Sequence, residues 1–81
     1  MNSDAYSEAQ HGMTQIKAAI HRLLAESETS GLRNADIGRA LGIYHGHEGH
    51  EGHISRTLLA ILEAEGVVVQ DKEAKTWSLR S

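Results

Sequence analysis

The chain has 81 residues, of which 40% are hydrophobic and 23% are charged, with a net charge of −3 and no cysteine, proline or phenylalanine. Such a length predicts one small domain with a thin core, which leaves little room for an enclosed substrate cavity and argues against an enzyme. Without cysteine there is no disulfide framework and no thiolate chemistry, so we expect a cytoplasmic protein. The apolar runs are far shorter than the ~20 residues of a bilayer span, and residues 1–12 are polar, so we expect no membrane or targeting segment.

The first part of the chain divides at about Met13. Residues 1–12 show no sustained apolar period and end in glycine, which predicts a flexible N-terminal tail. From Met13 to Leu24, apolar residues recur in steps of three and four, which predicts an amphipathic helix with Thr14 as its candidate N-cap. Polar residues 27–31 predict a loop after it. We therefore expect a single folded domain over residues 13–81.

A second, shorter helix is expected directly after the dipeptide Leu32-Arg33, which is too short to form a strand by itself. Asn34 is a good N-cap, and the apolar residues that follow it predict a helix that ends at Gly42. Gly42 fits the left-handed position that commonly terminates a helix.

A third helix and a hairpin complete the chain. The helix, expected from about Gly52 to Glu65, has an inward stripe formed by Ile54, Leu58, Ile61 and Leu62. Gly66 ends it, and the β-branched run 67–69, a charged turn at 71–75 and alternating residues 76–79 then predict a β-hairpin. We expect Trp77 to pack in the core rather than to stack on a base.

This order of elements, with two of its segments, resembles the winged helix-turn-helix superfamily. Residues 34–43 (NADIGRALGI) resemble its second helix, and residues 54–68 (ISRTLLAILEAEGVV) are similar to its recognition helix and first wing strand. The resemblance implies a mainly α fold with a small β-hairpin (α+β), in which three helices are followed by a C-terminal wing and Leu32-Arg33 adds a third strand. It also implies a small bacterial DNA-binding protein.

The resemblance places the DNA contacts mainly on the third helix. A recognition helix buries one stripe and presents small or polar side chains to the major groove. On this helix the expected contacts are Ser55, Arg56, Thr57 and Ala60. Arg56 is the strongest candidate because a guanidinium binds guanine or phosphate in a bidentate manner. The alternative is a solvated arginine, or one paired with Glu63 or Glu65.

Further phosphate contacts are expected on either side of that helix. Asn34 and Arg39 would supply them from the second helix, and Lys72 and Lys75 from the hairpin turn. Asn34 has the alternative role of an N-cap. The two lysines alternate with acidic residues, so a solvated turn is their alternative.

Residues 43–53 depart from the family pattern, because the turn before the recognition helix is normally only a few residues long. The segment IYHGHEGHEGH supports three interpretations. In the first, His50 and His53 contact DNA. In the second, His45, His47, His50 and His53 bind a metal ion, although histidines three apart drift round a helix and fix no geometry. In the third, the segment is a glycine-rich loop, and Tyr44 either covers the end of the second helix or is an exposed contact.

Together these features predict a non-enzymatic transcriptional regulator that binds double-stranded DNA without a cofactor. The resemblance also implies a possible homodimer, because a single module with few positive charges binds DNA weakly and a twofold arrangement doubles the contacts. The dimer interface would be formed by the first helix and residues 1–12. One alternative is a protein-interaction module, favoured by the net acidity and by Glu48, Glu51, Glu63 and Glu65. The other is a metal-responsive regulator that uses the histidine-rich segment.

Overall fold

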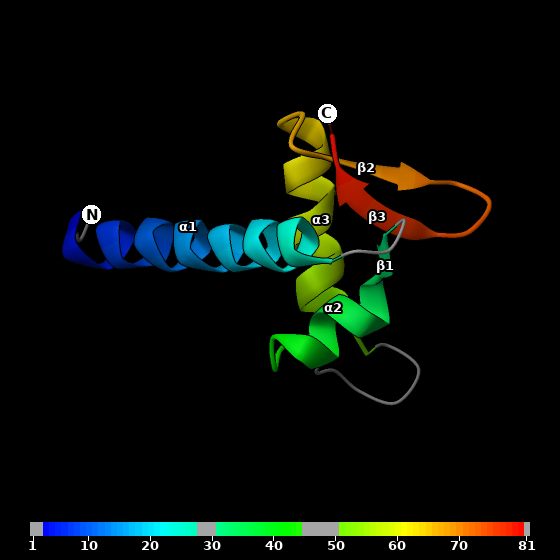
Figure 1. The fold of residues 1–81 in the computed structure, drawn as a ribbon. Coiled ribbons are helices and arrows are strands. Elements are labelled where there is room, and N and C mark those ends of the chain that lie inside the picture. The colour runs from blue at the N-terminus through cyan, green and yellow to red at the C-terminus, as the bar shows by residue number, and fades with distance from the viewer. Residues whose placement is uncertain (1–2, 28–30, 45–50, 81) are drawn as a thin grey trace.

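The computed structural model describes residues 3–27, 31–44 and 51–80 (Figure 1). This part of the chain is a small α+β fold with three helices and one three-stranded antiparallel sheet. In chain order the elements are α1 (Ser3–Glu26), β1 (Leu32–Arg33), α2 (Asn34–Ala40), α3 (His53–Ala64), β2 (Val68–Asp71) and β3 (Thr76–Leu79). None of the helices in the described ranges combines the length and the apolar character needed to cross a bilayer.

The sheet has the order β1-β3-β2, so the last strand lies between the other two. Leu32 of β1 pairs with Trp77 of β3, and Val68 of β2 pairs with Leu79. The predicted strand Leu32-Arg33 and the predicted hairpin are therefore confirmed. Because β1 comes directly before α2, its pairing with β3 holds the start of α2 beside the hairpin.

Asp71, at the start of the hairpin turn, holds the turn together through hydrogen bonds to the backbone of the residues that follow it. The Asp71 carboxylate accepts hydrogen bonds from the backbone N–H groups of Glu73 (2.9 Å) and Ala74 (3.1 Å). The backbone N–H of Lys75 donates to the Asp71 carbonyl at 2.7 Å, and Lys75 itself has a left-handed φ of 62°. An aspartate that bonds the backbone two and three residues ahead is a common means of fixing a turn.

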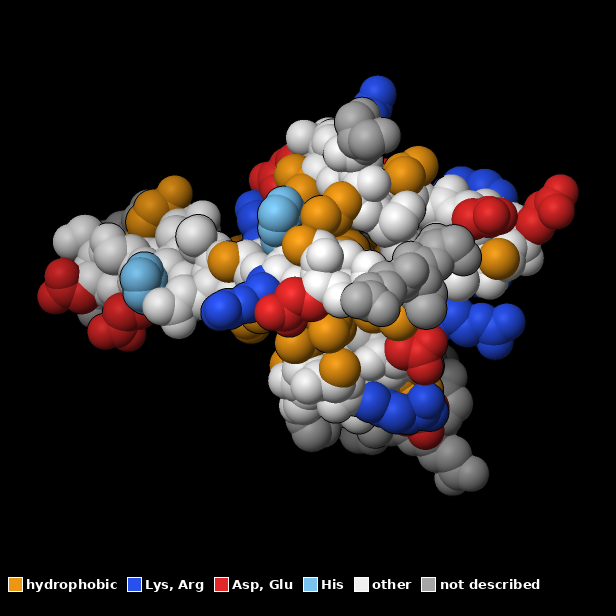
Figure 2. Space-filling view, in the orientation of Figure 1, with side chains coloured by type: hydrophobic (Ala, Val, Ile, Leu, Met, Phe, Trp, Pro, Cys, Tyr) orange, Lys and Arg blue, Asp and Glu red, His pale blue; other side chains and the backbone are white. Residues whose placement is uncertain are grey.

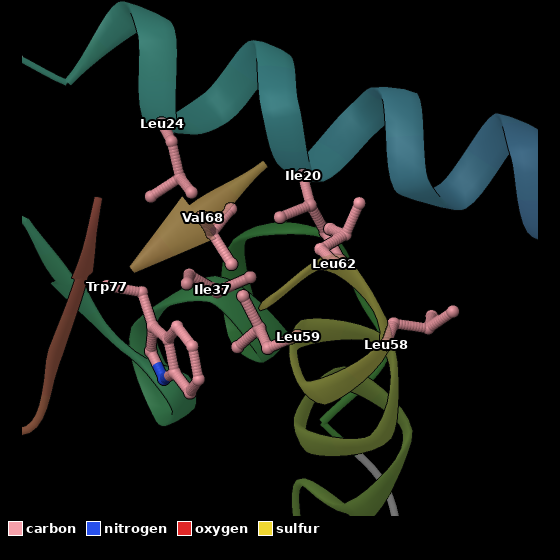
Figure 3. Packing of buried hydrophobic residues seen from close by; sticks show 8 residues of the cluster. All are labelled: Ile20, Leu24, Ile37, Leu58, Leu59, Leu62, Val68 and Trp77. Carbon is pink, nitrogen blue, oxygen red and sulfur yellow. The ribbon is translucent and has the colours of Figure 1, made fainter. Parts of the chain in front are cut away.

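The core lies where α1 crosses α3 and the sheet (Figure 3). Figure 3 shows Ile20 and Leu24 pointing from α1 toward the side chains of α3 and the sheet. Trp77 is only 7% exposed, so its predicted core position is confirmed. The eight buried hydrophobic residues are Ile20, Leu24, Ile37, Leu58, Leu59, Leu62, Val68 and Trp77.

The first helix begins ten residues before the predicted start. Residues 3–12, expected to be a flexible tail, are helical, and Thr14 lies inside the helix rather than at its cap. The side chains of residues 3–11 are exposed, so packing against the core does not hold this part of α1. Its helicity follows from local preference: residues 8–10 (EAQ) are good helix formers, and Asp4 places a negative charge in the first turn.

The buried face of α3 differs from the predicted one. It is formed by Ser55, Leu58, Leu59 and Leu62, whereas Ile54 and Ile61 are only half-buried. Both stripes have helical spacing, and they differ by a rotation of roughly 60° about the helix axis. The observed face places Leu58 and Leu59 in the core together and turns the small Ser55 toward α2.

Candidate nucleic-acid interface

Asn34 joins the start of α2 to the start of α3. Its Nδ2 donates to the Gly52 carbonyl at 3.1 Å, and its Oδ1 accepts a hydrogen bond from the Ser55 hydroxyl at 2.8 Å. The predicted N-cap role of Asn34 is therefore wrong. Arg33 occupies the N-cap position, and its backbone N–H donates to the Asp36 carboxylate at 3.2 Å. Since its amide is bonded on both sides, Asn34 positions α3 against α2 rather than acting primarily as a phosphate ligand.

Tyr44 packs into the same junction, which settles its alternatives in favour of covering the end of α2. A Cβ added at Gly38 would lie 3.0 Å from the Tyr44 ring, and one at Gly52 would lie 2.9 Å from it. Both glycines are thus required by the close approach of this ring. The guanidinium carbon of Arg39 lies 4.5 Å from the centroid of the same ring. This distance is within the range of a cation–π contact.

The exposed face of α3 retains three of the four predicted contact residues. Arg56, Thr57 and Ala60 are exposed, with the Thr57 hydroxyl donating to the His53 carbonyl at 2.7 Å. The prediction that Ser55 contacts DNA is wrong. Ser55 is 0% exposed, because the rotation of α3 turns it inward, where its hydroxyl contacts Asn34 and the Gly52 carbonyl.

An open cleft of about 370 Å³ lies between the start of α2, the first turns of α3 and the hairpin turn. Three cations from these separate segments line it: Arg33, Arg56 and Lys75. The carboxylate of Glu73 lines it as well, so its charge is predominantly but not entirely positive. Figure 2 shows the same mixture of blue and red side chains at the hairpin end of the molecule.

Arg33 was missed by the sequence-based interpretation. The signal that could have identified it is the alternation of side chains between the two faces of a strand. Leu32 is half-buried and pairs with Trp77, so the next residue, Arg33, lies on the exposed face. That side became relevant only because β1 pairs with β3 and brings Arg33 to the hairpin that carries Lys75.

The acidic residues near α3 are largely paired with cations that do not line this cleft. Lys72 lies 3.7 Å from Glu63, and Lys17 of α1 lies 3.0 Å from Glu65. Of the two lysines predicted in the hairpin turn, Lys72 thus contacts a carboxylate of α3, whereas Lys75 lines the cleft. Within the described part of the chain, none of the three cleft cations forms an ion pair. The Arg56 guanidinium donates to the Glu51 carbonyl at 3.4 Å.

The histidine predictions fall mostly outside the described residues. His45, His47 and His50 lie in the range 45–50, so the proposed DNA contact of His50 and the metal interpretation remain predictions. His53 is the first residue of α3 and is exposed. Among the residues that the structure describes, no three His, Cys, Asp or Glu side chains gather as a metal site.

Comparison with known proteins adds nothing to this geometry: no protein-family model, curated protein or solved structure matches the chain.

Proposed function

We propose that this chain is a winged helix-turn-helix domain that binds double-stranded DNA and acts as a transcriptional regulator. The order α1-β1-α2-α3-β2-β3 and the short strand β1 at one edge of the sheet agree with the arrangement that the sequence resemblance implies. In this proposal α3 enters the major groove, which is about 12 Å wide and accepts one helix.

One observation carries the proposal: Arg33, Arg56 and Lys75 come from three separate segments and line one open cleft beside the exposed face of α3. Cations that already have carboxylate partners contribute little to phosphate binding, but these three have none among the described residues. Arg56 is positioned to contact a base edge or a phosphate from α3, while Arg33 and Lys75 would contact phosphates on either side.

The net charge of −3 does not contradict this proposal, because Glu63 near the end of α3 and Glu65 directly after it each lie beside a lysine. Glu63 pairs with Lys72, and Glu65 pairs with Lys17. These pairs reduce the repulsion that a free carboxylate would exert on the DNA backbone. Glu73, the carboxylate that lines the cleft, limits affinity, so we expect weak binding of a random duplex that is strongest at low salt.

Fluorescence anisotropy of a labelled random-sequence duplex, followed from low to physiological salt, tests the proposal. Each lost phosphate contact reduces the magnitude of the negative slope of log K against log salt by about 0.9. The triple variant R33Q/R56Q/K75Q should therefore bind with a slope whose magnitude is smaller by about 2.7 than that of wild type. The matched single variants are Arg56→Gln in the cleft and Arg80→Gln after β3. Arg80 is exposed, directly follows β3, and is not among the residues that line the cleft.

We expect Arg56→Gln to weaken binding markedly and Arg80→Gln to change it little. Equal losses from the two variants would show that only overall charge matters and would contradict the role of the cleft. A wild-type chain without salt-dependent duplex binding would refute DNA binding and favour the protein-interaction alternative.

A further inference from the structure

The two lysines of the hairpin turn, Lys72 and Lys75, have different surroundings. Lys75 lines the cleft and forms no ion pair within the described part of the chain. The ammonium group of Lys72 lies 3.7 Å from the Glu63 carboxylate and donates a hydrogen bond to Gln70 Oε1 at 3.3 Å. Because Gln70 is one of the residues that line the cleft, this ammonium group lies at the edge of the cleft.

Glu63 lies on the same face of α3 as Arg56. The two residues are seven apart, which is close to two helical turns, and both are exposed. The face that α3 turns toward DNA in the proposed function therefore carries a cation in its first turn and a carboxylate near its end. That carboxylate is the group that holds Lys72.

The pair between Lys72 and Glu63 is one that a small change can open. The Lys72 side chain is 72% exposed, and an exposed ion pair contributes little free energy. Lysine has a flexible stem, and the hydrogen bond to Gln70 already joins its ammonium group to a residue of the cleft. Without Glu63, the Lys72 ammonium group can therefore turn toward a phosphate bound in the cleft.

We propose that Glu63 competes with DNA phosphates for Lys72 and thereby limits the affinity of the cleft for DNA. This inference rests on the proposed function. While Lys72 stays with Glu63, the three cleft cations bind DNA without it; when Glu63 is removed, Lys72 becomes a fourth cation for the phosphates. Phosphate contacts supply affinity that does not depend on base sequence, so the effect appears with a random duplex.

Two glutamates that are two residues apart provide a matched pair of variants. Glu63→Gln should raise the affinity for a random duplex about two- to fivefold at low salt, and should increase the magnitude of the salt slope by about 0.9. Glu65→Gln removes the same charge but releases Lys17 of α1, which does not line the cleft, so the affinity should stay near that of wild type. The double variant E63Q/K72Q should also return to the wild-type affinity and slope. Fluorescence anisotropy measures all four proteins.

NMR of the lysine ε-methylene groups locates the added contact, because the chain has only three lysines. In the wild type, the duplex should shift the Lys75 signal and leave those of Lys17 and Lys72 in place. In Glu63→Gln it should shift the Lys72 signal as well.

Three results would each overturn the inference: equal gains from Glu63→Gln and Glu65→Gln, a gain that persists in E63Q/K72Q, or a Lys72 signal that the duplex shifts as much in the wild type as in Glu63→Gln. A wild type that binds the duplex and a Glu63→Gln variant that binds no better would do the same while leaving the proposed function intact. A wild type that binds no duplex would instead refute the proposed function itself.

Discussion

Gly52 is the residue at which a single added methyl group should damage the α2–α3 junction most. It is buried, precedes α3 with a left-handed φ of 81°, and accepts the hydrogen bond from Asn34 Nδ2. A Cβ there would lie 2.7 Å from that nitrogen and 2.9 Å from the Tyr44 ring. The left-handed conformation costs an alanine about 1–2 kcal/mol. Displacing the Asn34 amide costs about 1 kcal/mol more through its hydrogen bond.

Gly52→Ala should therefore lower the free energy of unfolding by about 2–3 kcal/mol, and the midpoint of thermal unfolding by roughly 10–20 °C. Gly42→Ala is the matched control. Gly42 also has a left-handed φ, of 71°, but a Cβ there would meet nothing within 4 Å. This control should lose only the conformational part, about 1–2 kcal/mol, and so about 1 kcal/mol less than Gly52→Ala. Urea unfolding followed by circular dichroism measures both; equal losses, or a Gly52→Ala variant within 0.5 kcal/mol of wild type, would refute the proposed tight junction.

Three further substitutions and one control variant test the core, the junction and the hairpin turn. Leu59→Ala removes a fully buried side chain and should cost about 2–5 kcal/mol in urea unfolding; a loss below 1 kcal/mol would contradict the packing. Ser55→Ala leaves Asn34 Oδ1 without its buried donor and should cost about 1–2 kcal/mol, whereas Thr57→Ala on the exposed face should stay within about 0.5 kcal/mol. Lys75→Gly, at a φ of 62°, should leave the thermal midpoint unchanged or raised while weakening duplex binding in anisotropy; unaltered binding would exclude Lys75 from the interface.

The helix and hairpin signals in the sequence were mostly local, and the structure follows them closely. The third helix, expected from about Gly52 to Glu65, spans His53–Ala64. The glycines expected to end the second and third helices, Gly42 and Gly66, both have left-handed φ values. Such signals depend on spacing and backbone preference within a few residues, so one chain segment contains all the information they need.

The start of α1 was missed although it is also a local feature. Hydrophobic periodicity detects a helix by the face it buries, and residues 3–11 bury none. Their helix-forming composition supports the extra turns, but it gives no buried stripe, and these residues were therefore assigned to a tail.

The orientation of α3 is a feature that the local sequence pattern could not determine. The sequence gives the 3.6-residue period, but two overlapping stripes satisfy it, one through Ile54 and one through Ser55. The choice depends on what α2 presents to α3, and the Asn34 amide oxygen, which accepts the hydrogen bond of the Ser55 hydroxyl, favours the small polar side chain at this position. Asn34 is a residue type that commonly caps helices, but here its side chain joins α2 to the start of α3, because the packing of the two helices brings Gly52 and Ser55 within hydrogen-bonding distance.

The candidate interface combines both kinds of information. Arg56 and Lys75 were expected from the sequence because the family resemblance places DNA contacts on the third helix and at the hairpin turn. The sequence by itself thus determined where helices, turns and strands occur, since backbone hydrogen bonding and apolar spacing act within a few residues. Only the tertiary structure decided that Arg33 joins these two cations while Lys72 pairs with Glu63, because strand pairing and the packing of α3 bring together side chains far apart in the chain.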